Sequence, residues 1–311
     1  MLHPSSRHLA DGPALARTCG FPSAVPGSAC PTFGGSGRTT SKGLPLPASA
    51  YDRGNPPDSR KGMHVRLVRL VHEGSPRHGV IDGDRVVLTD GDPFGGLRTT
   101  TVSLALDQAR LLAPVEPTTV YGMAANSGEE VPATPLAFLK PAATVIGPEE
   151  AIRVPDVGLV EFEAECAAVI GRSARHVSAA DALEYVLGYT CANDVTARDV
   201  QAAEPTSLRA KGYETFTPLG PWLETELDPH DLGLQGFVGQ KLVQDARTSE
   251  LARQVDEIIA WLSSIVTLRP GDVVLTGAPG RTGPIVDGDV VEIEVEGIGR
   301  LRNPVRGDAF G

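Results

Sequence analysis

The triplet Glu163-Ala164-Glu165, followed 29 residues later by Asp194, constrains this chain more than any other feature. Successive side chains in a strand point to opposite faces, so both glutamates of a strand would share one face, about 7 Å apart along the backbone. Two such carboxylates repel each other unless a cation lies between them. With Asp194 they form an all-oxygen ligand set, which Mg²⁺ or Mn²⁺ prefers over the sets typical of Zn²⁺. The triplet therefore predicts a divalent-metal site.

The same alternation has a simpler interpretation. Glu163 and Glu165, with apolar residues on either side, also describe the solvated face of an antiparallel sheet. Half-buried strands with this pattern are common. The triplet alone does not decide between a metal site and a wet sheet face, but the motifs that follow it favour the metal site.

Five ordered blocks lie between residues 161 and 305. They are Glu163-x-Glu165-x3-Val169-Ile170-Gly171, Gly188-Tyr189-x3-Asn193-Asp194-Val195-Thr196-Ala197-Arg198-Asp199-x-Gln201, Lys211-x3-Thr215-Phe216-x-Pro218-Leu219-Gly220-Pro221, Leu268-x-Pro270-Gly271-Asp272-Val273-x-Leu275-Thr276-Gly277-x-Pro279 and Glu296-Gly297-Ile298-Gly299-x-Leu301-x-Asn303-Pro304-Val305. In this order the blocks resemble the fumarylacetoacetate hydrolase family, whose members are metal-dependent enzymes acting on 2-oxo acids and 1,3-dicarbonyl compounds. A looser match begins at Met63.

Strand-like segments dominate the chain after residue 63. Alternation over 65–72, a turn signal at Asp82-Gly83-Asp84 and runs at 119–123, 159–171, 186–193, 237–243, 272–276 and 290–295 predict strands. Helices are predicted over 178–185 and 248–265 from a Ser N-cap and from apolar spacing. The pattern predicts a β-dominated α+β fold. The family resemblance implies a rolled mixed β-sandwich with a small N-terminal β domain, assembled as a homodimer.

Three regions are expected along the chain. Residues 1–62 contain nine Pro, nine Gly and eight Ser, without sustained apolar periodicity, and are predicted to be a disordered leader or a misassigned start before Met63. Prolines 114 and 117 mark a boundary, so 63–117 is expected to be the small β domain and 118–308 the catalytic domain of the resemblance.

Charge and composition restrict the partners. The first 62 residues carry +4, which leaves −15 on the remainder out of a net −11. An acidic body lacks the basic footprint that nucleic acids or anionic membranes require, and no apolar run reaches the length of a membrane span. Only Cys166 and Cys191 lie beyond the first region, so we expect a reduced cytoplasmic protein with inert buried thiols.

The resemblance assigns roles to individual residues. It implies that Glu163, Glu165 and Asp194 bind Mg²⁺ or Mn²⁺, which would polarise the 2-oxo group of a small anionic 2-oxo acid and stabilise its enolate. It also places Arg198 and Gln201 at the substrate. Because Arg198 and Gln201 lie four and seven residues after Asp194, a helical turn there would align them. The remaining assignments are Lys211 as a catalytic residue and Thr276 and Gly277 as substrate-binding residues.

One departure from the family leaves the reaction open. The family pattern Gly-x-Asn-Tyr-x-x-His-x-x-Glu is replaced here by a segment that lacks the histidine thought to activate water, and Glu129 or Glu130 is the candidate substitute. Loss of a general base would slow hydrolysis by a factor of about 10² to 10⁴. The chain is predicted to be a C–C bond hydrolase, with Glu129 or Glu130 as the base, or a decarboxylase. The alternatives are an isomerase or tautomerase of a 2-hydroxy-dienoic acid, a metal-binding pseudoenzyme and a β-rich binding module without metal.

Overall fold

The computed structural model describes residues 65–204 and 206–308. The predicted leader lies outside these ranges. Twelve of the described strands form one large sheet. Its main path runs in the order β4 (Gly96–Ala105), β3 (Arg85–Asp92), β2 (Ser75–Asp82), β1 (Arg66–His72), β14 (Thr217–Glu224), β12 (Val186–Asn193), β11 (Ala164–Ile170), β17 (Val273–Leu275), β6 (Val120–Ala124) and β7 (Leu136–Lys140). Two further strands, β5 (Arg110–Leu112) and β8 (Val145–Ile146), pair with β1 and β14.

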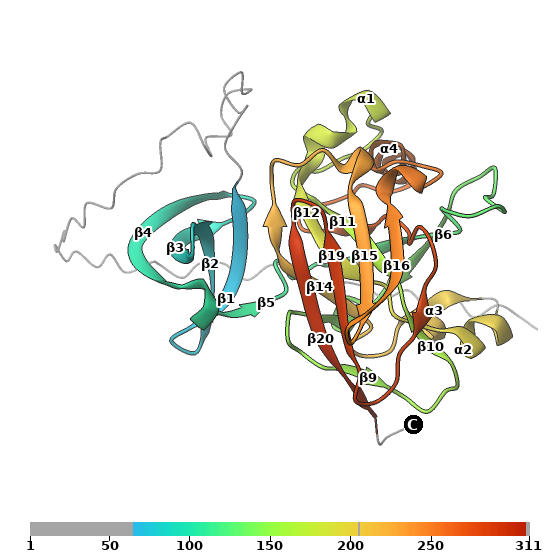
Figure 1. The fold of residues 1–311 in the computed structure, drawn as a ribbon. Coiled ribbons are helices and arrows are strands. Elements are labelled where there is room, and N and C mark those ends of the chain that lie inside the picture. The colour runs from blue at the N-terminus through green and yellow to red at the C-terminus, as the bar shows by residue number, and fades with distance from the viewer. Residues whose placement is uncertain (1–64, 205, 309–311) are drawn as a thin grey trace, which may run out of the picture. The chain divides into compact units, whose positions relative to one another are not determined.

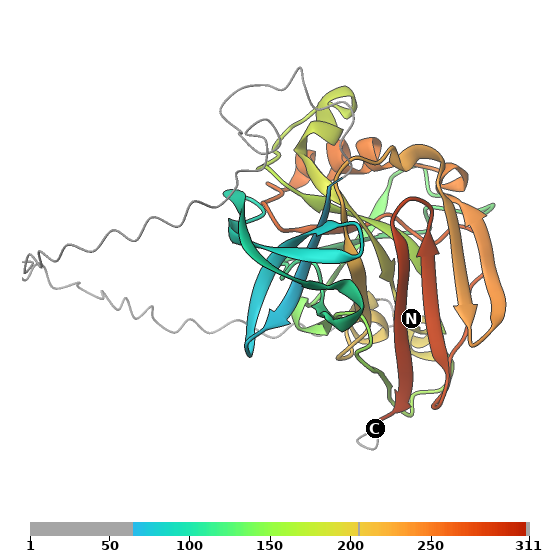
Figure 2. The ribbon, with the colours of Figure 1, turned by 60° about the vertical axis from the view of Figure 1, so that its left-hand side comes forward.

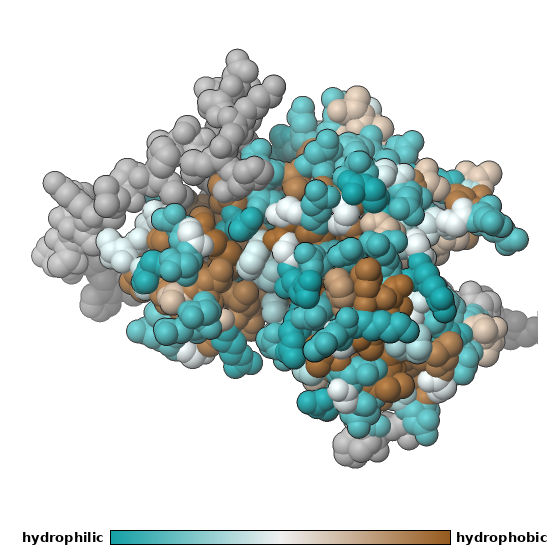
Figure 3. Space-filling view, in the orientation of Figure 1, coloured by the Kyte–Doolittle hydropathy of each residue, from teal (hydrophilic) through white to brown (hydrophobic). Residues whose placement is uncertain are grey.

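A second sheet packs against the part of the large sheet formed by β14, β12 and β11, as Figure 1 and Figure 2 show. It has the order β16 (Lys241–Arg247), β15 (Gly233–Val238), β19 (Val290–Val295), β20 (Gly299–Gly307) and β9 (Ile152–Val154). A third, short sheet contains β13 (Thr196–Ala197), β10 (Val160–Phe162) and β18 (Gly283–Pro284). In Figure 3, hydrophilic and hydrophobic residues are interspersed on the visible face.

The main core lies between the two larger sheets. Strand β11 is buried on both faces, and all of its residues except Glu165 are small or apolar. Cys166 and Ile170 on one face of β11 join a cluster with Ile293 of β19 and Leu234 of β15. The opposite face, with Val169, belongs to a second cluster. A strand that is buried on both faces has a nearly continuous apolar sequence, because neither face contacts water. This explains the small and apolar residues that follow Glu165.

Helices are few and short. They are α1 (Ala179–Ala182), α2 (Arg198–Ala203), α3 (Ser207–Lys211), α4 (Val255–Ile265) and the 3-10 turns η1 (Leu106–Gln108), η2 (Ala142–Thr144), η3 (Leu183–Tyr185), η4 (Pro229–Asp231) and η5 (Thr248–Glu250). The buried face of α4 packs Ile258, Ile259 and Leu262 into the main core. None of the helices within the described ranges has the length and hydropathy to cross a bilayer.

The β-dominated α+β prediction is confirmed. The predicted helix 178–185 is shorter than expected, because α1 ends at Ala182 and the turn η3 follows it, and three further local predictions need correction. The predicted strand 237–243 is a hairpin, because β15 ends at Val238 and β16 begins at Lys241. The predicted strand 159–171 is interrupted at Glu163, since β10 and β11 belong to different sheets. The predicted helix 248–265 is α4 preceded by the separate turn η5.

Candidate active site

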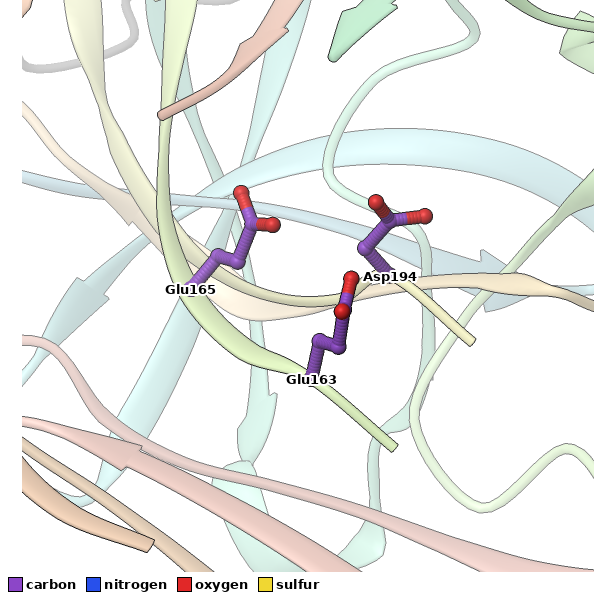
Figure 4. A group of neighbouring side chains, drawn as sticks. All are labelled: Glu163, Glu165 and Asp194. Atoms are coloured by element: carbon purple, nitrogen blue, oxygen red, sulfur yellow. The ribbon is translucent and has the colours of Figure 1, made fainter. Parts of the chain in front are cut away.

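The three predicted metal ligands meet at one end of β11. Glu165 lies opposite Ala192 in the antiparallel β11–β12 pair, and Asp194 immediately follows β12. The backbone N–H of Asp194 donates to the carbonyl oxygen of Glu163 at 3.0 Å, which places these two residues side by side. One carboxylate oxygen from each of the three residues lies within 4.8 Å of the others, and Figure 4 shows the side chains pointing toward one another.

Burial excludes the solvated sheet face that the sequence also allowed. Glu165 and Asp194 are each 1% exposed. A buried carboxylate needs hydrogen bonds or a nearby positive charge, because transfer of an unpaired charge out of water is very costly. The three residues, hereafter the acidic triad, therefore form an interior cluster. Its donors are all oxygens, which fits a hard divalent cation.

Two lysines contact the acidic triad. Lys211, at the end of α3, donates from Nζ to Glu163 Oε2 at 2.8 Å, to Asp194 Oδ2 at 2.5 Å and to Thr196 Oγ1 at 2.8 Å. Lys140, at the end of β7, is fully buried and forms an ion pair with Asp194 Oδ1. Its Nζ also donates to the carbonyl oxygen of Phe216 at 2.8 Å. Asp194 is thus bound by one ammonium group on each carboxylate oxygen.

Burial and charge shift the pKa values of the carboxylates in opposite directions. Burial, followed by repulsion from Asp194 and Glu163, raises the pKa of Glu165 well above its usual value. Burial alone would also raise the pKa of Asp194, but the ammonium groups of Lys140 and Lys211 hold it below its usual value. Glu165 is therefore the carboxylate whose charge is least compensated by the protein. A cation at the triad would relieve this imbalance.

Arg198 begins α2, and its guanidinium is largely occupied within the protein. Nε donates to Glu161 Oε2 at 2.8 Å and Nη2 to Glu163 Oε1 at 2.6 Å. Nη1 donates to Gln201 Oε1 at 3.0 Å, so the expected helical turn brings these two residues together. Thr282 links to both Glu161 and Arg198, at 2.8 and 3.3 Å. The guanidinium that the resemblance places at the substrate is thus held by Glu161 and Glu163.

Thr276 and Gly277 form a turn beside Glu165. The Gly277 N–H donates to Glu165 Oε2 at 2.7 Å, while the buried Thr276 hydroxyl donates to the carbonyl oxygen of Cys166 at 2.7 Å. The amide of Asn126 supports this turn by donating to the Thr276 carbonyl oxygen at 2.8 Å. In this arrangement the turn supports a triad residue, and its predicted contact with substrate stays a prediction.

The candidates for the missing base lie on a loop beside this turn. Glu129 and Glu130 are exposed in the segment between β6 and β7, and neither belongs to the cluster of carboxylates that forms the acidic triad. When the family pattern is aligned on Asn126, Glu130 takes the place of the histidine. The described histidines lie elsewhere: 72 and 78 on β1 and β2, 176 before α1 and 230 in η4.

Sequence reasoning missed three residues of this site. Lys140, Glu161 and Asn126 were each visible in the sequence, but no role was assigned to them. Glu161 extends the alternation of Glu163 and Glu165 by one step, which was an available signal. Lys140 reaches Asp194 across 54 positions, and no local pattern marks that contact.

The fold and the acidic triad define a β-sandwich protein with a candidate divalent-metal site. The chain belongs to the fumarylacetoacetate hydrolase family: residues 113–306 match the family model described as Fumarylacetoacetate (FAA) hydrolase C-terminal. Residues 65–114 match a second model, described as Rv2993c-like, N-terminal. Members of the family are enzymes, among them isomerases, tautomerases, decarboxylases and hydrolases.

Similar proteins span several of these activities. Protein Rv2993c of Mycobacterium tuberculosis is 46% identical over 68% of this chain and 84% of its own length. Oxaloacetate tautomerase Fahd2a of Rattus norvegicus is 37% identical over 64% of this chain and 70% of its own. The structure of 5-carboxymethyl-2-hydroxymuconate delta-isomerase from Mycobacterium smegmatis is 43% identical with a TM-score of 0.75, covering 78% of this chain and 100% of that one. Maleylpyruvate hydrolase from Sphingobium sp. SYK-6, in complex with manganese (II) ion and pyruvate, is 29% identical with a TM-score of 0.67, covering 78% and 99%.

Proposed function

We propose that the chain is an enzyme that requires Mg²⁺ or Mn²⁺ and acts on a small 2-oxo carboxylic acid. The observation that carries this proposal is the acidic triad itself: three carboxylates, two of them buried, with oxygens within 4.8 Å of one another. A structurally similar maleylpyruvate hydrolase holds manganese and pyruvate, which is a small 2-oxo acid. Its likeness supports both the cation and the substrate class.

A count of charges supports an anionic substrate. The triad carries three negative charges, and Lys140 and Lys211 carry two positive charges, while Arg198 and Glu161 balance each other. With all of these groups ionised, the interior site has a net charge of −1 before a cation binds. A divalent cation would change this to +1, and a substrate monocarboxylate would then neutralise it. Buried sites are stable when their charges are paired, so this count favours a cation together with a carboxylic acid.

When bound, the cation supplies Lewis-acid polarisation of the 2-oxo group and so favours loss of a proton or of CO₂ beside it. The side chains of the site hold the acidic triad in place and donate hydrogen bonds to the substrate. Lys211 keeps Glu163 and Asp194 in place, because its three N–H donors go to Glu163, Asp194 and Thr196. For the predicted catalytic role of Lys211, a substrate oxygen would have to replace one of these three acceptors. The second Nη1 hydrogen of Arg198, which has no acceptor among the described residues, and the amide of Gln201 can donate to the rest of the substrate.

The reaction best supported is keto–enol tautomerisation or decarboxylation, because neither needs an activated water. In the described part of the chain, histidines make their polar contacts away from the triad. C–C bond hydrolysis is the second candidate. It is favoured by the position of Glu130 in place of the family histidine and by the similarity to maleylpyruvate hydrolase. Isomerisation of a 2-hydroxy-dienoic acid shares the same enolate chemistry, and a metal-binding pseudoenzyme would show no turnover.

The test compares thermal unfolding with and without Mn²⁺ for the wild type, Glu165→Gln and Glu184→Gln. Glu165→Gln removes one triad charge with little change in shape. Glu184 is a matched control, because its side chain is 72% exposed and pairs with Arg172 outside the site. We expect Mn²⁺ to raise the Tm of the wild type and the control but not of Glu165→Gln. A full metal response in Glu165→Gln would refute the proposed ligand set.

Turnover is measured on the same samples with oxaloacetate and acetylpyruvate, by loss of enol absorbance and by pyruvate release. Enol loss or pyruvate formation from oxaloacetate alone indicates tautomerisation or decarboxylation. Cleavage of acetylpyruvate indicates hydrolysis with a replacement base. A wild type that responds to Mn²⁺ but turns over neither compound would favour the pseudoenzyme.

The organisation of the chain is also a proposal. We propose a small β domain over 63–117 and a catalytic domain over 118–308, supported by family matches that meet at residues 113 and 114. We further propose a homodimer in a reducing, cytoplasmic compartment. The free, buried thiols of Cys166 and Cys191 are consistent with that compartment.

A further inference from the structure

Arg253 binds both ends of the loop between β6 and β7, which comprises residues 125–135 and is hereafter called the β6–β7 loop. At the start of the loop, the Asn126 side chain accepts from the Arg253 backbone N–H at 3.0 Å and donates to the Arg253 carbonyl oxygen at 2.9 Å. At the end of the loop, Arg253 Nη2 donates to the carbonyl oxygens of Ala133, at 3.1 Å, and Pro132. One residue of a distant segment thus closes the loop from both sides.

The start of the loop is also joined to the turn that supports Glu165. Asn126 donates to the Thr276 carbonyl oxygen at 2.8 Å, and the next residue of that turn, Gly277, donates to Glu165 Oε2 at 2.7 Å. Ser127 Oγ donates to the carbonyl oxygen of Ala278 at 2.8 Å. The loop therefore begins two hydrogen bonds away from the acidic triad.

The guanidinium of Arg253 has no carboxylate partner among the described ion pairs, although the residue is partly buried. A charged donor to a neutral carbonyl forms a stronger hydrogen bond than a neutral donor does. Its side-chain hydrogen bonds go to the loop alone. This distinguishes Arg253 from a surface arginine that happens to approach a loop.

We propose that Arg253 is a positioning residue that holds the β6–β7 loop, which carries the exposed Glu130, in the conformation from which Glu130 would act at the acidic triad. The inference rests on the second candidate of the proposed function, in which Glu130 serves as the base for hydrolysis. With the contacts intact, the free span runs from Ser127 to Pro132, five chain steps. Without the guanidinium, the span runs to Leu136 at the start of β7, nine steps.

The two spans give the expected size of the effect. A chain step covers at most about 3.6 Å, so the longer span allows Glu130 to move nearly twice as far. The effective concentration of a tethered group is proportional to about the −3/2 power of the tether length for a flexible chain. If the group moves freely through the whole volume that the tether reaches, its concentration is proportional to about the −3 power of that length. Release of the loop should therefore lower the rate of a step that depends on Glu130 about two- to sixfold.

The test compares Arg253→Met, Arg253→Lys and Arg153→Met with the wild type. Arg153→Met is a matched control, because it removes the same charge from an exposed position on β9. In Arg253→Met we expect faster amide hydrogen exchange over residues 127–135 and an about two- to sixfold lower kcat for acetylpyruvate cleavage. The lysine variant should be intermediate, and the Mn²⁺-induced rise in Tm and the turnover of oxaloacetate should stay at wild-type values.

Three outcomes would overturn the inference. Unchanged hydrogen exchange in Arg253→Met would show that the contacts do not hold the loop. Equal losses on acetylpyruvate and oxaloacetate would show a general structural role. A wild type that turns over oxaloacetate but cleaves no acylpyruvate would remove the role of Glu130 and leave the proposed function intact, whereas a wild type without a Mn²⁺ response would contradict the proposed function itself.

Discussion

Replacement of the fully buried Lys140 by Met separates an electrostatic role from a structural one. Lys140 Nζ pairs with Asp194 Oδ1 and donates to the Phe216 carbonyl oxygen at 2.8 Å. Met has a similar length and no charge. The substitution leaves the Asp194 carboxylate in the interior with Lys211 as its remaining cation.

In the absence of metal, the variant should be much less stable. Removal of one partner from a buried ion pair costs about 3–5 kcal/mol, because the other charge stays buried with less compensation, which for Asp194 comes from Lys211 alone. For 150–250 residues, 1 kcal/mol corresponds to about 2–4 °C in Tm. We therefore expect the Tm of Lys140→Met to fall by roughly 6–20 °C.

Although Lys140→Met should be less stable without metal, it should bind a divalent cation more tightly than the wild type. Lys140 repels any cation at the triad, and its loss changes the net charge of the site from −1 to −2. Two unit charges about 5 Å apart interact by about 3 kcal/mol at an effective dielectric constant of about 20. Even half of this energy corresponds to about tenfold tighter Mn²⁺ binding. The Mn²⁺-induced rise in Tm should therefore be larger in Lys140→Met than in the wild type.

The assay is thermal unfolding across a Mn²⁺ titration, supported by calorimetric measurement of Mn²⁺ affinity. Arg302→Met is the control, because Arg302 pairs with Glu149 at the surface, where both side chains are exposed. An exposed pair contributes at most about 1 kcal/mol, so the control should resemble the wild type. A weaker Mn²⁺ response in Lys140→Met, or an unchanged Tm without metal, would refute the charge argument.

Two further substitutions test other parts of the fold. The hydrogen bond that the His230 ring donates to the Asp228 carboxylate raises the pKa of His230, which also approaches Asp256 of α4. The stability that this pKa shift contributes is fully present below the unfolded pKa of about 6.5 and is lost as pH rises through the higher folded pKa. His230→Gln should therefore lower the Tm at pH 5.5 and not at pH 9. A difference in Tm that does not depend on pH would contradict this. Gly277 has φ +103°, and a Cβ added at this position would lie 3.0 Å from Asn126 Cβ. Gly277→Ala should therefore lower the free energy of unfolding by about 1–3 kcal/mol and reduce the Mn²⁺-induced rise in Tm. Unchanged values of both would show that the turn tolerates a side chain.

Local patterns were sufficient for much of the fold. Strands with strict apolar alternation or continuous apolar runs were predicted well: the predicted strands 186–193 and 290–295 coincide with β12 and β19. The turn at Gly83 joins β2 and β3 as expected. Failures occurred where a chain reversal or a change of sheet interrupts an apolar run. The hairpin at Gly239 and the break at Glu163 are both of this kind.

The sequence by itself determined that Arg198 would lie one helical turn from Gln201, because this relation depends only on backbone periodicity. It also predicted that the carboxylates of Glu163 and Glu165 would be neighbours, but on one face of a single strand, whereas they meet at the break between β10 and β11. It also identified the family, which linked Asp194 to the pair. Only the tertiary structure decided that the triad is buried, that Lys140 neutralises part of it and that Arg253 holds the β6–β7 loop. Those contacts join positions 54 to more than 100 residues apart, and they depend on how sheets and loops pack rather than on any local pattern.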